Sequence, residues 1–122
     1  MDITSLDFQQ ANIKQVLFKS RLRSVLYGVR EADAALFSMQ ENPLGQWLYS
    51  VVKPKYSSYP EVREIERAMQ QMMDAGRDLV TQYQRGRIEE ARAGMDRVDT
   101  YANQITTLLQ RLEKNIRTNT TV

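Results

Sequence analysis

The stretch IEEARAGMDRVDTYANQITTLLQRLEKNI, residues 88–116, decides the fold. Its apolar residues recur at alternating steps of three and four positions, as on the buried face of a helix in a bundle or coiled coil. The series is Ile88, Ala91, Met95, Val98, Ala102, Ile105, Leu109, Leu112 and Ile116. It predicts one helix of about 30 residues. Gly94 within it either costs about 1 kcal/mol relative to alanine or marks the close approach of another element.

A second long helix is predicted from Pro60 to Arg85. Proline is favoured in the first turn, Glu61 suits the positive end of the helix dipole, and Gly86 is a typical terminating residue. The positions expected to face inward are Val62, Ile65, Met69, Met72 or Met73, Gly76, Val80 and Tyr83. Only the residues around Gly86 separate this helix from the last one, so the two are expected to form an antiparallel hairpin.

The first helix is expected to begin near Asp7, which forms a capping-box pattern with Gln10, and to end or bend at Gly28. Its inward stripe reads Phe8, Ala11, Gln15, Phe18, Leu22, Val25 and Val29. Gln15 interrupts this stripe, and an amide buried without partners costs about 1 to 3 kcal/mol. We therefore expect Gln15 to be hydrogen-bonded inside the bundle or to reach water.

Three shorter segments connect the first long helix to the second. A short helix is predicted over ADAALFSMQ, residues 32–40, and a turn or short helix over PLGQWLYS, residues 43–50. VVKPKYSSY, residues 51–59, is polar, contains proline and lacks periodicity, which predicts a surface loop. The fold class expected from all these elements is all-α: an antiparallel four-helix bundle with a short extra helix or turn around Trp47.

The composition is that of a single globular domain, with 42% hydrophobic and 26% charged residues. One bundle domain is expected over residues 1–117, with the polar tail 118–122 frayed. The first residues lack the basic start and apolar run of a signal peptide, and no apolar stretch approaches the roughly 18 residues of a membrane span. The expected location is the cytoplasm, without membrane contact.

The chain contains neither cysteine nor histidine. This excludes disulfides, thiolate or imidazole metal ligands, cysteine nucleophiles and histidine-dependent triads. Its carboxylates alternate with basic residues, as in Glu64 with Arg67 and Glu89 with Arg92, which is typical of solvated helix faces. The glycines are scattered singly, so there is no glycine-rich phosphate loop. We expect neither an enzyme nor a cofactor.

Met69, Met72 and Met73 lie on one face of the predicted 60–85 helix. Thioethers can bind Cu(I). In a bundle, however, methionine more often fills gaps between larger side chains. Packing is therefore the favoured interpretation of these three residues.

PLGQWLYS, residues 43–50, is followed after a short loop by YPEVREIERAMQQMMDAG, residues 59–76. These stretches resemble the chemoreceptor zinc-binding (CZB) domain family, in which Cys-x-Leu-Gly-x-Trp-Leu-Tyr precedes a Pro-Glu-led helix carrying His-x-x-x-His. Upstream, ANIKQVLFKSRLRSVLYG, residues 11–28, is similar to the family's first helix. The resemblance covers roughly Phe8 to Leu112, and Leu-Gly-x-Trp-Leu-Tyr is its most specific part.

The same resemblance places the family's four zinc ligands, three His and one Cys, at Gln15, Asn42, Met69 and Met73. Amides and thioethers are poor zinc ligands, so zinc binding is not expected. Met69 and Met73 would fill the volume by packing, while Gln15 and Asn42 would hydrogen-bond to each other or to a trapped water. Asn42 also precedes Pro43, where asparagine commonly begins a turn.

The resemblance implies a bacterial cytoplasmic regulatory module, because family members are attached to chemotaxis receptors or to diguanylate cyclases, and some are dimers. The expected function is a non-catalytic sensory or interaction bundle that binds no zinc and contacts a protein of a signalling system. A homodimer is one expectation, since Tyr101 and Leu108 add apolar surface beside the long seam of the last helix. The other expectation is that the four helices bury this seam completely.

Two alternatives belong to other classes of function. A small-molecule or cofactor site would use the space of the lost metal site, lined by Met69, Met73, Gln15, Trp47 and Phe18. Phe18, Trp47 and Tyr49 are the candidate binding residues. Nucleic-acid binding would rest on Arg85, Arg87, Arg92 and Arg97. The net charge of +2, from 17 basic and 15 acidic residues of interspersed sign, is too weak to favour it.

Overall fold

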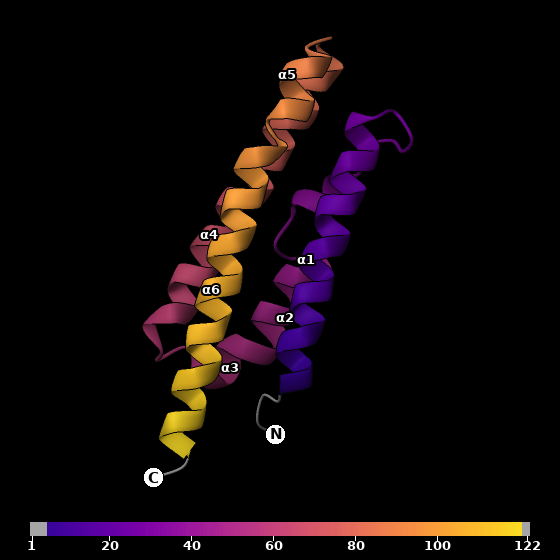
Figure 1. Cartoon of the computed structure of the whole chain (residues 1–122). Coiled ribbons are helices and arrows are strands. Elements are labelled where there is room, and N and C mark those ends of the chain that lie inside the picture. Colours follow the sequence, from indigo (N-terminus) through magenta and orange to yellow (C-terminus); the bar gives the residue numbers. More distant parts are fainter. Residues whose placement is uncertain (1–4, 121–122) are drawn as a thin grey trace.

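A computed structural model of the chain describes residues 5–120, and their side chains as far as residue 118. Within that range the elements are helices and turns, without a strand. The bundle has four helical segments, and consecutive segments run in opposite directions (Figure 1). They are α1 (Ser5–Leu26), a segment of short helices over residues 34–56, α4 (Pro60–Gln84), and α5 (Ile88–Ala93) followed by α6 (Met95–Thr120). The expected all-α antiparallel bundle is confirmed.

The hairpin of α4 with α5 and α6 is the framework of the bundle, and Gly86, with a φ of +86°, lies in the turn that joins them. The seam residues from Ala91 to Ile116 are buried as predicted. Ile88 is 38% exposed, contrary to prediction, because it begins α5 directly after the turn. The predicted single helix is interrupted at Gly94, where an added Cβ would lie 2.3 Å from Cδ2 of Leu79. The close approach of α4 thus accounts for this glycine.

Helix α1 buries the predicted inward stripe, which comprises Phe8, Ala11, Gln15, Phe18, Leu22 and Val25. Two details of the prediction were wrong. The helix already includes Ser5, so Asp7 lies in its first turn and does not cap it together with Gln10. Val29 is 80% exposed because α1 ends at Leu26 and Gly28, with a φ of +76°, turns the chain away.

The segment over residues 34–56 differs most from the sequence prediction. In place of the helix expected over residues 32–40 there is a short 3₁₀ helix, η1 (Ala34–Phe37). The Asp33 side chain caps its start by accepting from the N–H of Ala35. After it come α2 (Pro43–Trp47), the π-helical segment η2 (Leu48–Val52) and α3 (Lys53–Tyr56). Helical backbone angles at Leu48 and Lys53 join these three pieces into one continuous run.

The surface loop predicted over residues 51–59 was therefore wrong for its first six positions. Val52 and Tyr56, spaced by one helical turn, are 0% and 8% exposed and pack in the core. Pro54 suggested a loop because proline cannot donate a hydrogen bond to the carbonyl of Ser50. The chain keeps its helical path by changing pattern just before Pro54, since the N–H of Lys53 bonds to the carbonyl of Leu48.

Side-chain contacts fix the helices at both ends of the bundle. At one end, Ser5 Oγ donates to Glu113 Oε2 at 3.0 Å, and Arg117 donates to Ser5 Oγ. At the other end, Arg92 Nε donates to the carbonyl of Leu26 at 2.9 Å and its guanidinium stacks over the Tyr27 ring at 4.1 Å. These contacts show that α6 runs antiparallel to α1, as Figure 1 depicts.

The boundaries of the expected domain fall close to the ends of the described range. Helix α6 runs to Thr120, so 118–120, the first part of the tail expected to fray, is helical. Residues 121–122 of that tail, and residues 1–4 of the stretch tested for a signal peptide, lie outside the described residues. Over residues 5–120, every helix is too short or too polar to span a lipid bilayer.

Candidate functional site

The stretch that carries the family resemblance begins with a buried cap. Asn42 is 3% exposed, its Oδ1 accepts from the N–H of Leu44 at 2.9 Å, and its Nδ2 donates to the carbonyl of Leu36 at 2.7 Å. Asparagine followed by proline is a common way to begin a helix. The expected hydrogen bond between Asn42 and Gln15 is not formed, because Oδ1 of Asn42 caps α2 and its Nδ2 bonds to the carbonyl of Leu36 in η1.

Gly45 and Trp47 pack the stretch 43–50 against the rest of the chain. A Cβ added at Gly45 would lie 2.1 Å from the carbonyl oxygen of Met39, so only glycine fits there without a backbone shift. Trp47 is 5% exposed and meets the Phe8 ring edge-on, with 6.0 Å between centroids. Close packing in this structure therefore accounts for Gly45 and Trp47 of the Leu-Gly-x-Trp-Leu-Tyr motif.

Tyr49 binds the same stretch to α4. Its hydroxyl donates to Glu66 Oε2 at 2.7 Å, and Lys53 donates to Glu66 Oε1 at 3.0 Å. Burial, then the hydrogen bond to Glu66 and its negative charge, raises the pKa of Tyr49 to about 12. Burial alone would raise the pKa of Glu66, but the hydrogen bonds from Tyr49 and Lys53 and the Lys53 charge outweigh it and lower that pKa. We call Tyr49, Lys53 and Glu66 the polar clamp.

Gln15, Met69 and Met73 lie inside the bundle, with exposed fractions of 4%, 0% and 0%. A Cβ on Gly76 would lie 3.3 Å from Cζ of Phe18, which sets the relative height of α1 and α4. Helices α1 and α4 run in the same direction, and Gln15 and Met73 each come three residues before the contact between Phe18 and Gly76. Gln15 and Met73 therefore lie at a similar height along the bundle axis. Three of the four resemblance-derived positions are thus buried core residues of neighbouring helices.

These positions lack the chemistry of a metal site. Residues 5–118 contain no group of three or more acidic side chains, the only remaining strong ligands in this chain, that is close enough to hold a metal ion. Met72, beside Met69 and Met73, is also fully buried among apolar side chains. Their arrangement is that of packed core methionines.

Two donors in this region are buried without a partner. Among the described side chains, Gln15 Nε2 and Trp47 Nε1 are buried and donate to no protein atom. Glu61 Oε2 is buried in the same way and accepts from no protein atom. An unpaired buried polar group costs about 1 to 3 kcal/mol. Gln15 Nε2 therefore lacks the protein acceptor that was one of the two expectations for this residue.

A ligand-sized cavity does not accompany these side chains. Phe18 borders a cavity of about 30 Å³, together with Leu17 and Asn42. Small-molecule sites usually measure about 300 to 1,000 Å³. Asn42 also borders a cavity of about 50 Å³, and the three pockets above 300 Å³ described within residues 5–118 are lined by other residues, so the packing gives no support to a small-molecule site at the former metal positions.

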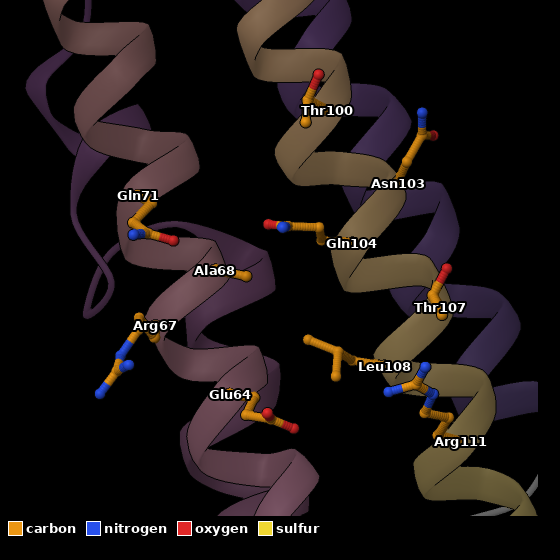
Figure 2. A pocket seen from close by; sticks show the side chains of 10 residues that line it. All are labelled: Glu64, Arg67, Ala68, Gln71, Thr100, Asn103, Gln104, Thr107, Leu108 and Arg111. Atoms are coloured by element: carbon orange, nitrogen blue, oxygen red, sulfur yellow. The ribbon is translucent and has the colours of Figure 1, made fainter.

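A surface groove of about 620 Å³ lies between α4 and α6. Figure 2 shows Ala68 and Leu108 pointing into the space between the two helices and Arg67 pointing away from it. Arg67, Arg111 and Glu64 give the groove charges of both signs, and none of the unpaired buried atoms among the described residues lines it. The groove is open and lined by polar and apolar atoms alike, with nothing that selects one ligand class.

The outward face of α1 is the feature that sequence reasoning missed. Leu6, Ile13 and Leu17 are 60%, 59% and 48% exposed, and Val16 beside them is 61% exposed. Leu6, Ile13 and Leu17 belong to a series of residues spaced alternately four and three positions apart, on the side of α1 opposite its buried stripe. We call this series the outer stripe: Leu6, Gln10, Ile13, Leu17, Ser20 and Ser24. The same step count that revealed the inner stripe would have found it.

The other candidate interaction surfaces are largely used within the chain. On α6, Tyr101 and Leu108 are half-buried and pack against the core. The apolar seam from Met95 to Ile116 is buried within the chain's own bundle. Arg92 bonds to α1, and Arg97 lies 3.6 Å from Asp78, which divides the basic cluster considered for nucleic acid. The outer stripe of α1 thus remains the main exposed apolar feature described.

Comparison with protein-family models, curated proteins and solved structures gives no match to this chain. The resemblance to the chemoreceptor zinc-binding domains therefore rests on the sequence stretches that carry it. In this structure those stretches have packing and capping roles.

Proposed function

We propose that this chain is a non-catalytic regulatory or interaction bundle, a zinc-independent relative of the chemoreceptor zinc-binding domains. It acts in the bacterial cytoplasm by binding a protein surface through α1. The observation that carries the proposal is the outer stripe, where Leu6, Ile13 and Leu17 lie exposed along one helix face. Exposed large apolar side chains that gather on one helix face are typical of surfaces covered by another protein.

The interior supports the zinc-independent part of the proposal. Met69 and Met73 are fully buried, and Asn42 caps α2 through its Oδ1 and donates to the carbonyl of Leu36 through its Nδ2. A bundle filled in this way keeps its shape without a metal. Its response to a partner then depends on contacts at its surface.

Site-specific photocrosslinking tests the interaction. A photoreactive amino acid replaces Ile13 on the outer stripe or, as a control, Gln110, which is exposed on α6. Both full-length variants are irradiated in the cells that naturally make the protein. The proposal expects a discrete crosslinked product from position 13 and none from position 110. Equal labelling at both positions, or no product at either, would contradict it.

A ligand-restoring variant tests the relationship to zinc-binding domains. If the resemblance assigns the positions correctly, the combined changes Q15H, N42C, M69H and M73H bring four strong ligands together. The variant is expected to bind one zinc ion per chain, measured by elemental analysis, while the original chain binds none. In the matched control, Q71H replaces M73H, because residues two apart on a helix do not face each other and position 71 is exposed. A folded restored variant that binds no zinc would argue against the relationship.

A further inference from the structure

Two rows of residues flank the outer stripe, and each member of a row is one position away from a member of the stripe. The rows are Asp7, Lys14 and Arg21 on one side and Gln9, Val16 and Arg23 on the other. In paired helices the positions beside the seam carry the charges that select the partner. Beyond the first turn of α1, every charge in these two rows is positive.

The three cations of the rows are not neutralised by the chain itself. Lys14, Arg21 and Arg23 form no ion pair with any residue of the range 5–118. The remaining cation of the helix, Lys19, lies 3.4 Å from Asp99 of α6 and is paired within the bundle. Both arginines are exposed and Lys14 is partly exposed, so their charges are available to a second molecule.

We propose that the occupant of the outer stripe is an acidic amphipathic helix of a different protein. Its apolar residues would pack on Ile13 and Leu17, and aspartates or glutamates on both sides of its seam would face the cations of α1. This inference rests on the proposed function and names the chemistry of the partner. Opposite charges beside the seam decide which helices pair and speed their encounter.

A small hollow in the surface brings two of the cations together. Lys14, Leu17 and Arg21 border the cavity of about 30 Å³ beside Pro43, and no acidic side chain lines it. Although Lys14 and Arg21 are two helical turns apart, one carboxylate placed over this hollow would lie between them. The basic row therefore meets the apolar stripe at a point where an acidic side chain of the partner fits.

The same charges disfavour a second copy of α1 as the occupant. Packed antiparallel, the second helix would set its own Lys14 beside Lys14 and would oppose Leu6 with Ser24. Packed parallel, it would gather the cations of both copies at the same height. Like charges brought together in an interface reduce affinity, whereas an acidic helix relieves the repulsion in either direction.

A lipid surface also fits the outer stripe less well than a helix does. Half of the stripe is polar, namely Gln10, Ser20 and Ser24. The hydrocarbon region of a bilayer offers no hydrogen-bond partner to an amide or a hydroxyl, whereas the side chains of another helix do. The other apolar face of α1 is already buried in the bundle, so only the outer stripe could enter the bilayer.

Binding of two synthetic peptides to the full chain tests the charge of the partner. Both are amphipathic helices about three heptads long with a leucine seam. One carries glutamate on both sides of the seam, and the other carries lysine at the same positions. Fluorescence anisotropy is expected to show that the glutamate peptide binds about tenfold or more tightly than the lysine peptide. Added salt should reduce this preference, because ions screen exposed charges.

Charge reversal on α1 should reverse the preference of the chain for the two peptides. The flanks are reversed in one triple variant: K14E, R21E and R23E. The matched control reverses three exposed arginines of α4 and α6: R63E, R67E and R111E. Both variants change the net charge equally, so only the first is expected to bind the lysine peptide more tightly. Circular dichroism confirms that both keep their helical content.

Several results would overturn the inference. Equal binding of the two peptides, no binding of either, or a preference that the flank variant retains would each do so. Sedimentation equilibrium that shows self-association weakened by I13K would assign the outer stripe to a second copy. Co-sedimentation with vesicles containing phosphatidylglycerol, also lost in I13K, would assign it to a lipid surface if neither peptide binds.

Photocrosslinking from position 13 separates the failure of this inference from the failure of the proposed function. The flank variant is expected to lose the crosslinked product that the original flanks give. A product that persists in the flank variant would leave the interaction function standing and overturn the acidic helix. No product from position 13, together with no binding of either peptide, would overturn both.

Discussion

Helices α6 and α1 distribute their apolar residues differently. In α6 the large apolar side chains from Met95 to Ile116 fall on one side and are buried or half-buried by the same chain. In α1 the inner stripe contains the buried amide of Gln15, while the outer stripe leaves Leu6 and Ile13 exposed. The core of the chain fully explains an amphipathic helix such as α6. It does not explain the exposed apolar side chains of a helix such as α1, for which we propose a second surface.

The sharpest test compares an isoleucine from each helix. Ile105 of α6 is 0% exposed, so Ile105→Ala is expected to lower the free energy of unfolding by about 2 to 5 kcal/mol. Ile13 of α1 is 59% exposed, and Ile13→Ala is expected to change it by no more than about 0.5 kcal/mol in dilute, monomeric protein. Urea unfolding measures both. Similar losses would mean that the outer stripe belongs to the folding core.

The inner stripe of α1 depends on the short helices, whose position depends on Gly45. Gly45→Ala would push a Cβ into the carbonyl of Met39 and is expected to destabilise by about 3 kcal/mol, the upper end for overpacking. At Gly94 the nearest atom is the end of the flexible Leu79 side chain, so Gly94→Ala is the milder control. The measurement is the midpoint of thermal unfolding. Equal shifts for the two alanine variants would show that the contact with Met39 can relax.

The buried amide in α1 offers a stabilising substitution. Gln15→Leu removes the unpaired donor and adds apolar contact, so it is expected to increase the free energy of unfolding by about 1 kcal/mol. Gln10→Leu, on the exposed side of the same helix, is the control and should have little effect. Urea unfolding of both variants checks the difference. A loss of stability in Gln15→Leu would indicate that the amide makes a hydrogen bond to an internal water.

The polar clamp should give the smallest effect and a characteristic pH dependence. Tyr49→Phe removes one hydrogen bond to Glu66 and is expected to cost about 1 kcal/mol, less if water replaces it. Because the folded pKa of Tyr49 is raised, its contribution is complete below pH 10 and is lost as the pH rises towards about 12. Because the pKa of Glu66 is lowered, its contribution is present above pH 4.5 and is lost on acidification below that value.

Thermal unfolding of the original chain, Tyr49→Phe and the control Tyr101→Phe across this pH range measures the clamp. The stability difference between the original chain and Tyr49→Phe should be greatest between the two limits and shrink towards both. A difference that does not vary with pH would show that the loss comes from packing alone.

Periodicity in the sequence was enough to predict the long helices and their buried faces. Steps of three and four residues located six of the buried residues of α1 but not Leu26, and the signals at Pro60 and Gly86 placed α4 within a residue of its observed ends. The same reasoning failed over residues 51–59. There, Pro54 and a π-helical turn break the regular spacing although the helical path continues. The position of such short segments depends on tertiary contacts, so their buried residues do not recur at a regular spacing in the sequence.

The candidate site was predictable only in part. The burial of Gln15, Met69 and Met73 followed from their places in apolar stripes. The role of Asn42 did not, because its second bond is to the carbonyl of Leu36, in a turn whose course the sequence does not reveal. The outer stripe of α1 was within reach of sequence reasoning. It was missed because the inner stripe already satisfied the expectation of one apolar face per helix.

The hydrogen bonds of Ser5 with Glu113 and Arg117 bring the two ends of the described chain together. Closing a short gap costs little loop entropy, so a brief linker between these ends should not strain the bundle. New ends opened at Gly86, which has nothing within 4 Å of an added Cβ, would cut an uncrowded turn. The fold therefore does not depend on which helix comes first along the chain, and a protein circularly permuted at Gly86 is expected to reach the same fold.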